Sequence, residues 1–127
     1  MAGDLEKRVR EMMRKMDAKD WDALTQMATD DLRGVDEITR QWTHGRKAII
    51  DGLRQAPIED LRTELRDVTE TTWGDTGLVT CWIEQDYTYQ GKPQHVSAPT
   101  TILLRRMGSD WRMVLFHSVP LPEASQA

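Results

Sequence analysis

The stretch VSAPTTILLRRM-GSD-WRMVLFHSV, residues 96–119, decides the fold because it reads as two strands joined by a tight turn. Residues that favour strands, mainly Thr, Val, Ile, Leu and aromatics, fill 96–107 and 111–119. The intervening Gly108-Ser109-Asp110 has the composition of a turn. Two further strands are expected upstream, at 62–73 and 78–89, and they are also bounded by glycine-containing turns. Four consecutive strands joined by short turns predict an antiparallel meander.

The first half of the chain has a helical period instead. Apolar residues recur at helical spacing at Leu5, Val9, Met12, Met13 and Met16. This stripe predicts an amphipathic helix over about 4–18. Asp20 predicts the N-cap of a second, short helix that ends at Asp30-Asp31. A third helix is expected from Thr43 to Ala56, before Pro57. Three helices and then a long-stranded curved sheet indicate one α+β domain over 1–127, with about 120–127 as a frayed tail.

The composition excludes several classes of protein. The chain has 127 residues, of which 39% are hydrophobic and 30% charged, and no apolar run approaches the roughly 20 residues that cross a bilayer. A net charge of -4 argues against a nucleic-acid partner, which would need clustered Lys and Arg. Cys81 is the only cysteine, so an internal disulfide and a cysteine-based metal cluster are excluded. The N-terminal residues do not read as a secretion signal, and a cytoplasmic location is expected.

Several segments carry a family resemblance: DAKDWDAL (17–24), ATDD (28–31), Val35-Asp36, HGRKAI (44–49), TILLRR (101–106) and WRMVLFHS (111–118). They resemble the nuclear transport factor 2-like superfamily, particularly its ketosteroid isomerase and SnoaL-like members. The resemblance implies a cone, in which a curved antiparallel sheet wraps around the three helices and is open at one end. It also implies a homodimer that forms through the outer face of the sheet, and the apolar alternation of the last three strands favours the same contact.

Asp36 falls at the position of the catalytic aspartate in ketosteroid isomerases, so the resemblance implies a general base. A carboxylate held in an apolar cone loses hydration, and its pKa rises toward the operating pH. The alternative is that Asp36 lies at a solvated strand end or caps a turn near Glu37.

The chain departs from the isomerase pattern where the oxyanion donors are expected. The two tyrosines of that family align with Met12 and Leu53, and its protonated aspartate falls near Thr101 or Ile102. Loss of even one such donor costs about a hundredfold in rate. Steroid isomerisation of the usual kind is therefore not expected.

The strand at 78–89 alternates two sets of side chains, and both include functional candidates. Trp82, Glu84 and Asp86 share one face, which by analogy with the superfamily is assigned to the cavity. Glu84 is then a second candidate acid or base, opposite Asp36 across the cone. A slip of one residue would exchange the two faces. The alternative for Glu84 and Asp86 is a surface salt bridge with Arg105 or Arg106.

A hydrophobic small molecule is the expected ligand. The residues expected to line its site are Met12, Met16, Trp42, Leu53, Trp82, Thr100, Ile102, Phe116 and Ser118. Methionines of this kind either line an adaptable pocket or fill the core. The three histidines lack the paired spacing of a zinc site, and no glycine-rich loop for a phosphate is evident, so neither a metal nor a cofactor is expected.

Two functions are consistent with these features. The first is cofactor-free proton transfer of the isomerase, cyclase or dehydratase type, with Asp36 as the base. The second is a non-catalytic module of the same fold that binds a small ligand or dimerises. The fold match alone does not choose between them.

Overall fold

Two helices, α1 (Asp4–Asp17) and α2 (Trp21–Gln26), begin the computed structural model, which describes residues 3–36 and 40–119. Both confirm the expected helices. Helix α2 begins where expected because Asp20 Oδ1 accepts a hydrogen bond from the Ala23 backbone N–H at 3.2 Å. It ends earlier than expected, at Gln26. The tail at 120–127, expected to be frayed, lies outside the described residues.

The expectation that helices fill the first half is wrong, because two strands follow α2. They are β1 (Ala28–Asp36) and β2 (Gln41–His44), which pair antiparallel with each other. Along β1, Leu32 and Gly34 are buried while Arg33 between them is exposed, which is the period of a strand. This strand was missed because Leu32 and Val35 are its only large apolar residues.

Helix α3 (Arg46–Gln55) ends before Pro57, as expected, but its start differs from the expectation. Thr43, the expected N-cap, lies inside β2, and Gly45 is the N-cap. The φ angle of Gly45 is +95°, a conformation that glycine adopts without strain. Among the described residues, no helix combines the length and the apolar content of a membrane-spanning segment.

Four long strands form the second half and confirm the expected meander. They are β3 (Ile58–Trp73), β4 (Thr76–Tyr89), β5 (Lys92–Met107) and β6 (Asp110–Ser118). The six strands form one sheet in the order β2-β1-β6-β5-β4-β3. All neighbours pair antiparallel except β1 and β6, which are parallel.

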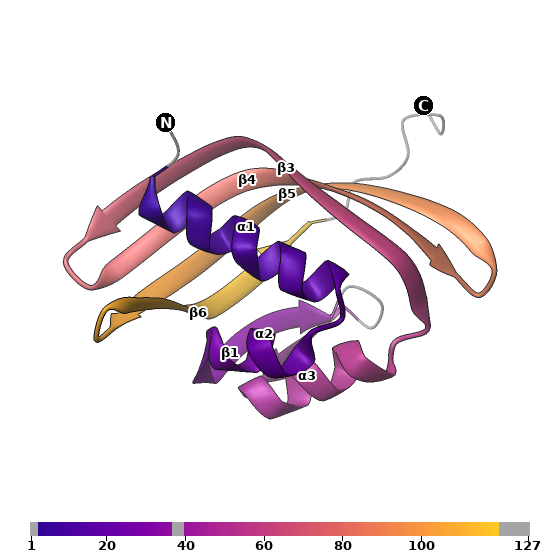
Figure 1. The fold of residues 1–127 in the computed structure, drawn as a ribbon, viewed down its shortest axis with the longest axis horizontal. Coiled ribbons are helices and arrows are strands. Elements are labelled where there is room, and N and C mark those ends of the chain that lie inside the picture. The colour runs from indigo at the N-terminus through magenta and orange to yellow at the C-terminus, as the bar shows by residue number, and fades with distance from the viewer. Residues whose placement is uncertain (1–2, 37–39, 120–127) are drawn as a thin grey trace.

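The sheet bends around the helices and forms the cone expected from the family resemblance. Two bulges in β3 contribute to the bend, one between Glu59 and Arg62 and one between Arg66 and Thr69. A residue with positive φ lies within each bulge, Asp60 at 54° and Asp67 at 53°. Figure 1 shows the curved sheet above α1, with α2 and α3 on the same side. We call the face toward the helices the concave face and the opposite one the convex face.

Helix α1 is joined to β3 at both of its ends. At its C-terminal end, Asp17 accepts hydrogen bonds from the backbone N–H of Thr63 at 2.8 Å and from its hydroxyl at 2.7 Å. At its N-terminal end, the Glu70 carboxylate accepts a hydrogen bond from the Glu6 backbone N–H at 3.2 Å. These contacts set the position of the helix along the sheet.

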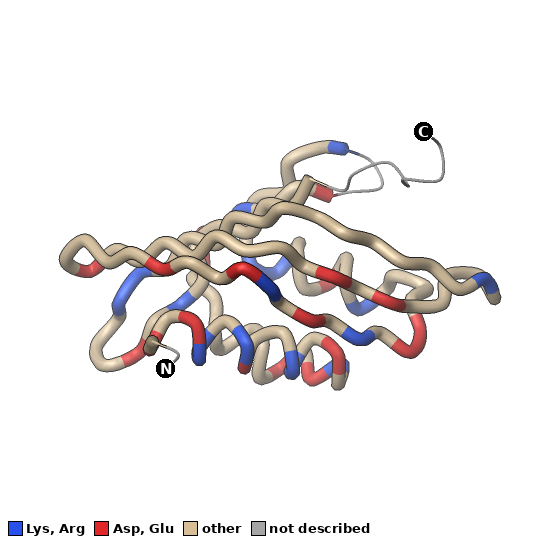
Figure 2. The backbone as a smooth tube through the Cα atoms, turned by 90° about the horizontal axis from the view of Figure 1, so that it is seen from above, with Lys and Arg blue, Asp and Glu red and all other residues tan. Residues whose placement is uncertain are grey.

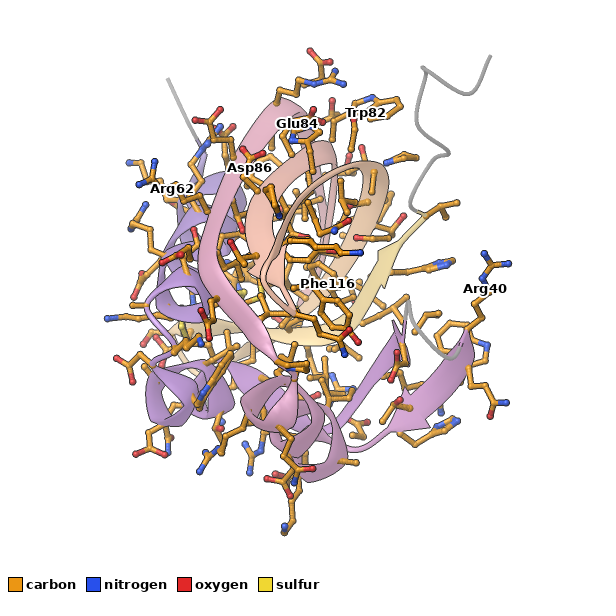
Figure 3. All side chains as sticks on the ribbon, turned by 90° about the vertical axis from the view of Figure 1, so that its right-hand side faces the viewer. Arg40, Arg62, Trp82, Glu84, Asp86 and Phe116 are labelled. Atoms are coloured by element: carbon orange, nitrogen blue, oxygen red, sulfur yellow. The ribbon has the colours of Figure 1, made fainter. Side chains whose placement is uncertain are left out.

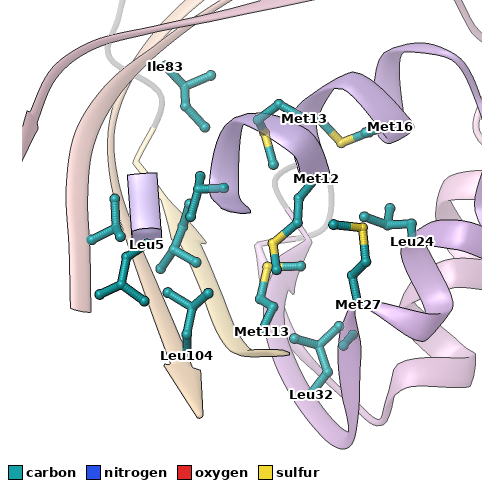
Figure 4. Close-up of a cluster of buried hydrophobic side chains, with 14 of the residues drawn as sticks. Leu5, Met12, Met13, Met16, Leu24, Met27, Leu32, Ile83, Leu104 and Met113 are labelled. Atoms are coloured by element: carbon teal, nitrogen blue, oxygen red, sulfur yellow. The ribbon is translucent and has the colours of Figure 1, made fainter. Parts of the chain in front are cut away.

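The apolar stripe of α1 forms the core against the concave face (Figure 4). Its members Leu5, Val9, Met12, Met13 and Met16 are all buried. Their partners on the sheet include Val79, Cys81, Ile83, Ile102 and Leu104. Met12 and Ile102, expected to line a ligand site, are both 0% exposed and belong to this core. The methionines therefore serve mainly as packing residues, which is the second of the two interpretations above.

The faces of β4 are the reverse of those expected from the family analogy. Ile83 is 1% exposed and packs in the core with α1, so the alternate residues Trp82, Glu84 and Asp86 lie on the convex face. Both sets of β4 side chains contain apolar residues, so the alternation alone could not identify the core side.

Truncation of a buried methionine tests this core. Met12→Ala should lower the free energy of unfolding by about 2–5 kcal/mol, because it leaves a cavity among residues that do not reach solvent. The matched control is Met107→Ala, since Met107 is 41% exposed and should change stability by less than about 0.5 kcal/mol. Urea denaturation measures both values. Equal effects of the two substitutions would contradict the core described here.

Candidate functional site

Asp36 is the last residue of β1, where it lies opposite Gln41 of β2. Its side chain is exposed, and its backbone oxygen accepts a hydrogen bond from the Arg40 N–H at 2.7 Å. The expectation of a carboxylate enclosed in an apolar cone is wrong for this residue. Two positions earlier, Gly34 is buried against Ile49 of α3, so β1 passes out of the packed region before it reaches Asp36.

The concave face holds most of the residues expected to bind a ligand. Thr100 and Ser118 are buried there, and their hydroxyl oxygens are 2.8 Å apart. Phe116 is half-buried and packs against the core. Figure 3 shows Phe116 beneath the arch of the sheet, whereas Trp82 and Glu84 lie on the outer side of the sheet. These three concave residues are therefore brought together as expected, whereas Trp82 and Glu84 are not.

A small cavity borders two other expected ligand residues, Met16 and Leu53. It measures about 20 Å³, and Lys19, Trp21, Ile58 and Leu61 complete its lining. This volume has room for about one water molecule. The cavity is too small for an organic ligand in this conformation.

A larger hollow of about 490 Å³ lies on the convex face, across β1, β2, β5 and β6. We call it the outer groove. Its apolar lining residues are Trp42, Leu103, Val114 and Leu115. Its charged or ionisable lining residues are Asp31, Arg33, His44 and Arg105. The volume falls within the range of small-molecule sites, and the apolar lining is also typical of a protein contact.

Only one of the groove residues, Trp42, was a candidate site residue from the sequence, and it was expected to line the site of a hydrophobic small molecule. It is 55% exposed on the convex face, where its ring lies 5.8 Å from the ring of His117. The groove was missed because β1 and β2 were not recognised as strands. Without them, nothing in the sequence places Arg33 and His44 beside Leu103.

Basic groups outnumber acidic ones in and beside the groove. Arg105 Nη2 lies 3.5 Å from Asp31 Oδ2. The pKa of Asp31 is lowered, first by a hydrogen bond from Thr29 and then by the charge of Arg105. Among the described residues, Asp31 is the only carboxylate in the groove lining, and Arg33 forms no ion pair. The groove therefore combines apolar and charged walls, and its charged residues carry a net positive charge.

A second group of polar side chains lies on the other half of the convex face, and we call it the outer cluster. It consists of Arg62, Glu64, Arg66, Glu84, Asp86, His95 and Ser97. The Ser97 hydroxyl donates a hydrogen bond to Glu84 at 2.6 Å. His95 Nδ1 lies 2.8 Å from Asp86, and its Nε2 lies 3.4 Å from Glu84. Among the described residues, no three His, Cys, Asp or Glu side chains are grouped to hold a metal ion.

The partners of Glu84 differ from those considered in the sequence analysis. Arg66 Nε lies 3.6 Å from Glu84, and the same guanidinium stacks 4.7 Å above the ring of Trp82. Arg105 pairs with Asp31, and Arg106 lies 3.8 Å from Asp75. The expectation that Glu84 faces Asp36 across the cone is therefore wrong, because Glu84 belongs to a surface network on the convex face.

Hydrogen bonding in the outer cluster shifts two pKa values in opposite directions. The hydrogen bond with Asp86, assisted by Glu84, raises the pKa of His95 above its usual value of 6.5. The hydrogen bond from Ser97, assisted by His95 and Arg66, lowers the pKa of Glu84. Both shifts favour the charged forms, so the cluster holds an imidazolium between carboxylates at mildly acidic pH.

An NMR titration of His95 tests this electrostatic arrangement. Its pKa should lie above 6.5, and Asp86→Asn should lower it, whereas Asp75→Asn at the distant β3–β4 turn should leave it unchanged. Because the folded-state pKa is raised, the stabilisation from His95 is complete below pH 6.5 and is lost as the pH rises through the folded value. Titration of His95 at or below 6.5 in the unaltered protein would contradict the arrangement.

Comparison with solved structures confirms the fold. A candidate dehydratase of the nuclear transport factor 2-like family from Streptomyces avermitilis aligns with a TM-score of 0.83 at 18% identity, over 94% of this chain and 95% of that one. The CaMKII hub of S. rosetta aligns with a TM-score of 0.78 at 21% identity, over 95% of this chain and 99% of that one. A candidate calcium/calmodulin-dependent protein kinase II association domain from Xanthomonas campestris aligns with a TM-score of 0.80 at 13% identity. The alignment covers 95% of this chain and 88% of that one. At these identities the likeness establishes the fold alone.

Sequence comparison gives the family. A search of curated proteins finds no relative that matches this chain. The family model of the SnoaL-like domain, by contrast, matches residues 5–122, which is nearly the whole sequence. Together with the cone-shaped sheet and its three helices, this match shows that the chain belongs to the SnoaL-like domain family.

Proposed function

We propose that this domain is a self-associating module that pairs with a second copy through the convex face of its sheet. The observation that carries the proposal is the outer groove, a hollow of about 490 Å³ with apolar walls on the face that the helices leave uncovered. Large apolar hollows on the surface of a protein domain mark sites of association or binding.

The apolar surface extends beyond the groove along the central strands. Convex-face residues from β4, β5 and β6 include Leu78, Trp82, Pro99, Leu103 and Leu115, and all of them are partly exposed. The helices pack on the concave side, so none of the described helices covers this row. A second sheet that covered this row would remove its apolar area from water, and each Å² removed would stabilise the pair by about 25 cal/mol.

The comparisons support the same proposal. One similar structure is a kinase hub and another is a candidate kinase association domain, and both names describe assembly on this fold. The homodimer expected from the sequence also used the outer face of the sheet. The cavity beside Met16 and Leu53, between the helices and the start of β3, offers less room, at about 20 Å³.

Substitutions on the two sides of the sheet test this proposal. Trp42→Ala should weaken self-association about thirtyfold, because Trp42 forms a wall of the outer groove. Arg14→Ala should leave it unchanged, since Arg14 is an exposed residue of α1, on the other side of the sheet. Sedimentation equilibrium at micromolar concentrations measures both dissociation constants. A monomer in the unaltered protein, or equal effects of the two substitutions, would overturn the proposal.

A proton-transfer enzyme is the second candidate function. It is supported by the grouping of Phe116, Thr100 and Ser118 on the concave face and by the likeness to a candidate dehydratase. In this proposal a small hydrophobic ligand lies beneath the arch of the sheet, and Asp36 at the end of β1 removes a proton from it without a cofactor. The cone would have to open further than the described hollow beside Leu53 to admit such a ligand.

Asp36→Asn tests the second candidate. Turnover of a carbonyl compound with an acidic α-hydrogen should fall by about a hundredfold or more, because the amide cannot accept the proton, while ligand affinity is retained. Asp75→Asn is the matched control, since it removes an exposed carboxylate at the β3–β4 turn. Deuterium exchange at the α-position, followed by NMR, measures the rate. Equal rates for Asp36→Asn and the unaltered protein would exclude Asp36 as the base.

A further inference from the structure

We propose that the outer groove binds a small amphipathic anion, in which one carboxylate is joined to an aromatic body. The site lies on the convex face, on the opposite side of the sheet from the helices. The proposal goes beyond the self-association described above and does not require it. It is carried by the register of four strands, which places a guanidinium group among the apolar walls of a hollow.

The middle row of the groove crosses these four strands. Arg33 of β1 lies opposite His44 of β2 on one side and opposite Leu115 of β6 on the other. Leu115 in turn lies opposite Leu103 of β5. All four residues line the hollow, so the pairing places Arg33 between a histidine and two leucines.

The two ends of the groove differ in chemistry. Trp42 lies beside the middle row on β2, and its 55% exposed ring provides an aromatic wall. Asp31 lies beyond the row in the opposite direction along β1, where it pairs with Arg105 of β5. The groove therefore runs from an aromatic end at Trp42 to a charged end at Asp31 and Arg105, with Arg33 between the two ends.

The charged residues of the lining favour a ligand with a single negative charge. Among the described residues, the lining holds the two guanidinium groups of Arg33 and Arg105 and the one carboxylate of Asp31, so one positive charge is in excess when His44 is neutral. Asp31 already lies 3.5 Å from Arg105, whereas Arg33 forms no ion pair with a described residue. A carboxylate matches a planar guanidinium group with two parallel hydrogen bonds.

The apolar lining favours a ring as the body of the ligand. Leu103, Val114 and Leu115 provide aliphatic surface beside Arg33, and Trp42 provides an indole ring. Aromatic rings stack on such surfaces and bury a large apolar area. A ring held at the Trp42 end can therefore direct its carboxylate toward Arg33. The volume of about 490 Å³ lies within the range of small-molecule sites.

The outer cluster, on the same face, does not provide a comparable anion site. Acidic and basic residues alternate along β3, as Figure 2 shows. On the neighbouring strand, Glu84 lies 3.6 Å from Arg66, and Asp86 lies 2.8 Å from His95. The cluster has no excess of positive charge, so the groove is the part of the convex face that is suited to an anion.

A charged probe and its neutral analogue test the site. Cinnamate carries the carboxylate and an aromatic ring, and cinnamamide has nearly the same shape without the charge. The broadening of the ligands' proton NMR lines measures both dissociation constants, at a protein concentration below the dissociation constant for self-association, where the groove is open. Cinnamate should bind at least about tenfold more tightly, because only the carboxylate forms charge-assisted hydrogen bonds with Arg33.

Three variants locate the two parts of the probe. Arg33→Gln should raise the dissociation constant of cinnamate about tenfold and leave that of cinnamamide unchanged, because it removes the charge and keeps the apolar walls. Trp42→Ala should weaken both compounds by a similar factor of at least about threefold, since the ring contacts the part that they share. Arg14→Gln is the matched control, an exposed arginine of α1 on the helix side, and should change neither value.

Equal affinities for cinnamate and cinnamamide, or equal effects of Arg33→Gln and Arg14→Gln on cinnamate, would overturn the proposal. The absence of cinnamate binding would overturn it as well. Sedimentation equilibrium reports on self-association separately. A monomeric protein that binds cinnamate through Arg33 would remove the self-association and leave the anion site standing, and a dimer that does not bind cinnamate below its dissociation constant would do the reverse.

Discussion

The burial of the α1 stripe against the concave face is the interaction on which the rest of the structure depends. Val9, Met12 and Ile102 are completely removed from solvent there. At about 0.8 kcal/mol for each buried methylene, this contact is the main favourable term that holds the helix inside the arch. The hydrogen bonds of Asp17 to Thr63 and of Glu70 to the start of α1 set its position along β3. The narrow part of the cone is consequently filled by side chains.

Where α1 packs against it, the concave face has no room for a ligand. The six-stranded sheet has two faces and the helices cover only one, so the convex face keeps its apolar residues in contact with water. The same face carries two groups of polar side chains, one in the outer groove and one in the outer cluster on β3, β4 and β5. Apolar area provides affinity in protein association, and the placement of charges provides register and selectivity. Both features lie on a single surface of this domain.

Much of the fold followed from the sequence, and the errors have identifiable physical causes. The long strands were recognised because strand-forming residues are separated by turns such as Gly108-Ser109-Asp110. The short strands β1 and β2 were missed because their large side chains are mostly polar and Asp30-Asp31 suggests a helix end. The candidate site was partly misplaced because both faces of β4 carry apolar residues. Only contact with α1 reveals that Ile83, rather than Trp82, faces the core. A pairing register is a tertiary property that the period of one strand cannot supply.

The most direct measurement is hydroxyl-radical footprinting of the unaltered protein at increasing concentration, read out at its tryptophans by mass spectrometry. Trp42 in the outer groove is 55% exposed in one copy of the chain, and Trp21 of α2 is half-buried on the helix side of the sheet. If the convex faces pair, oxidation of Trp42 falls as the concentration rises, while oxidation of Trp21 stays constant. If oxidation of Trp42 does not change with concentration, the convex face is not the surface through which this domain associates.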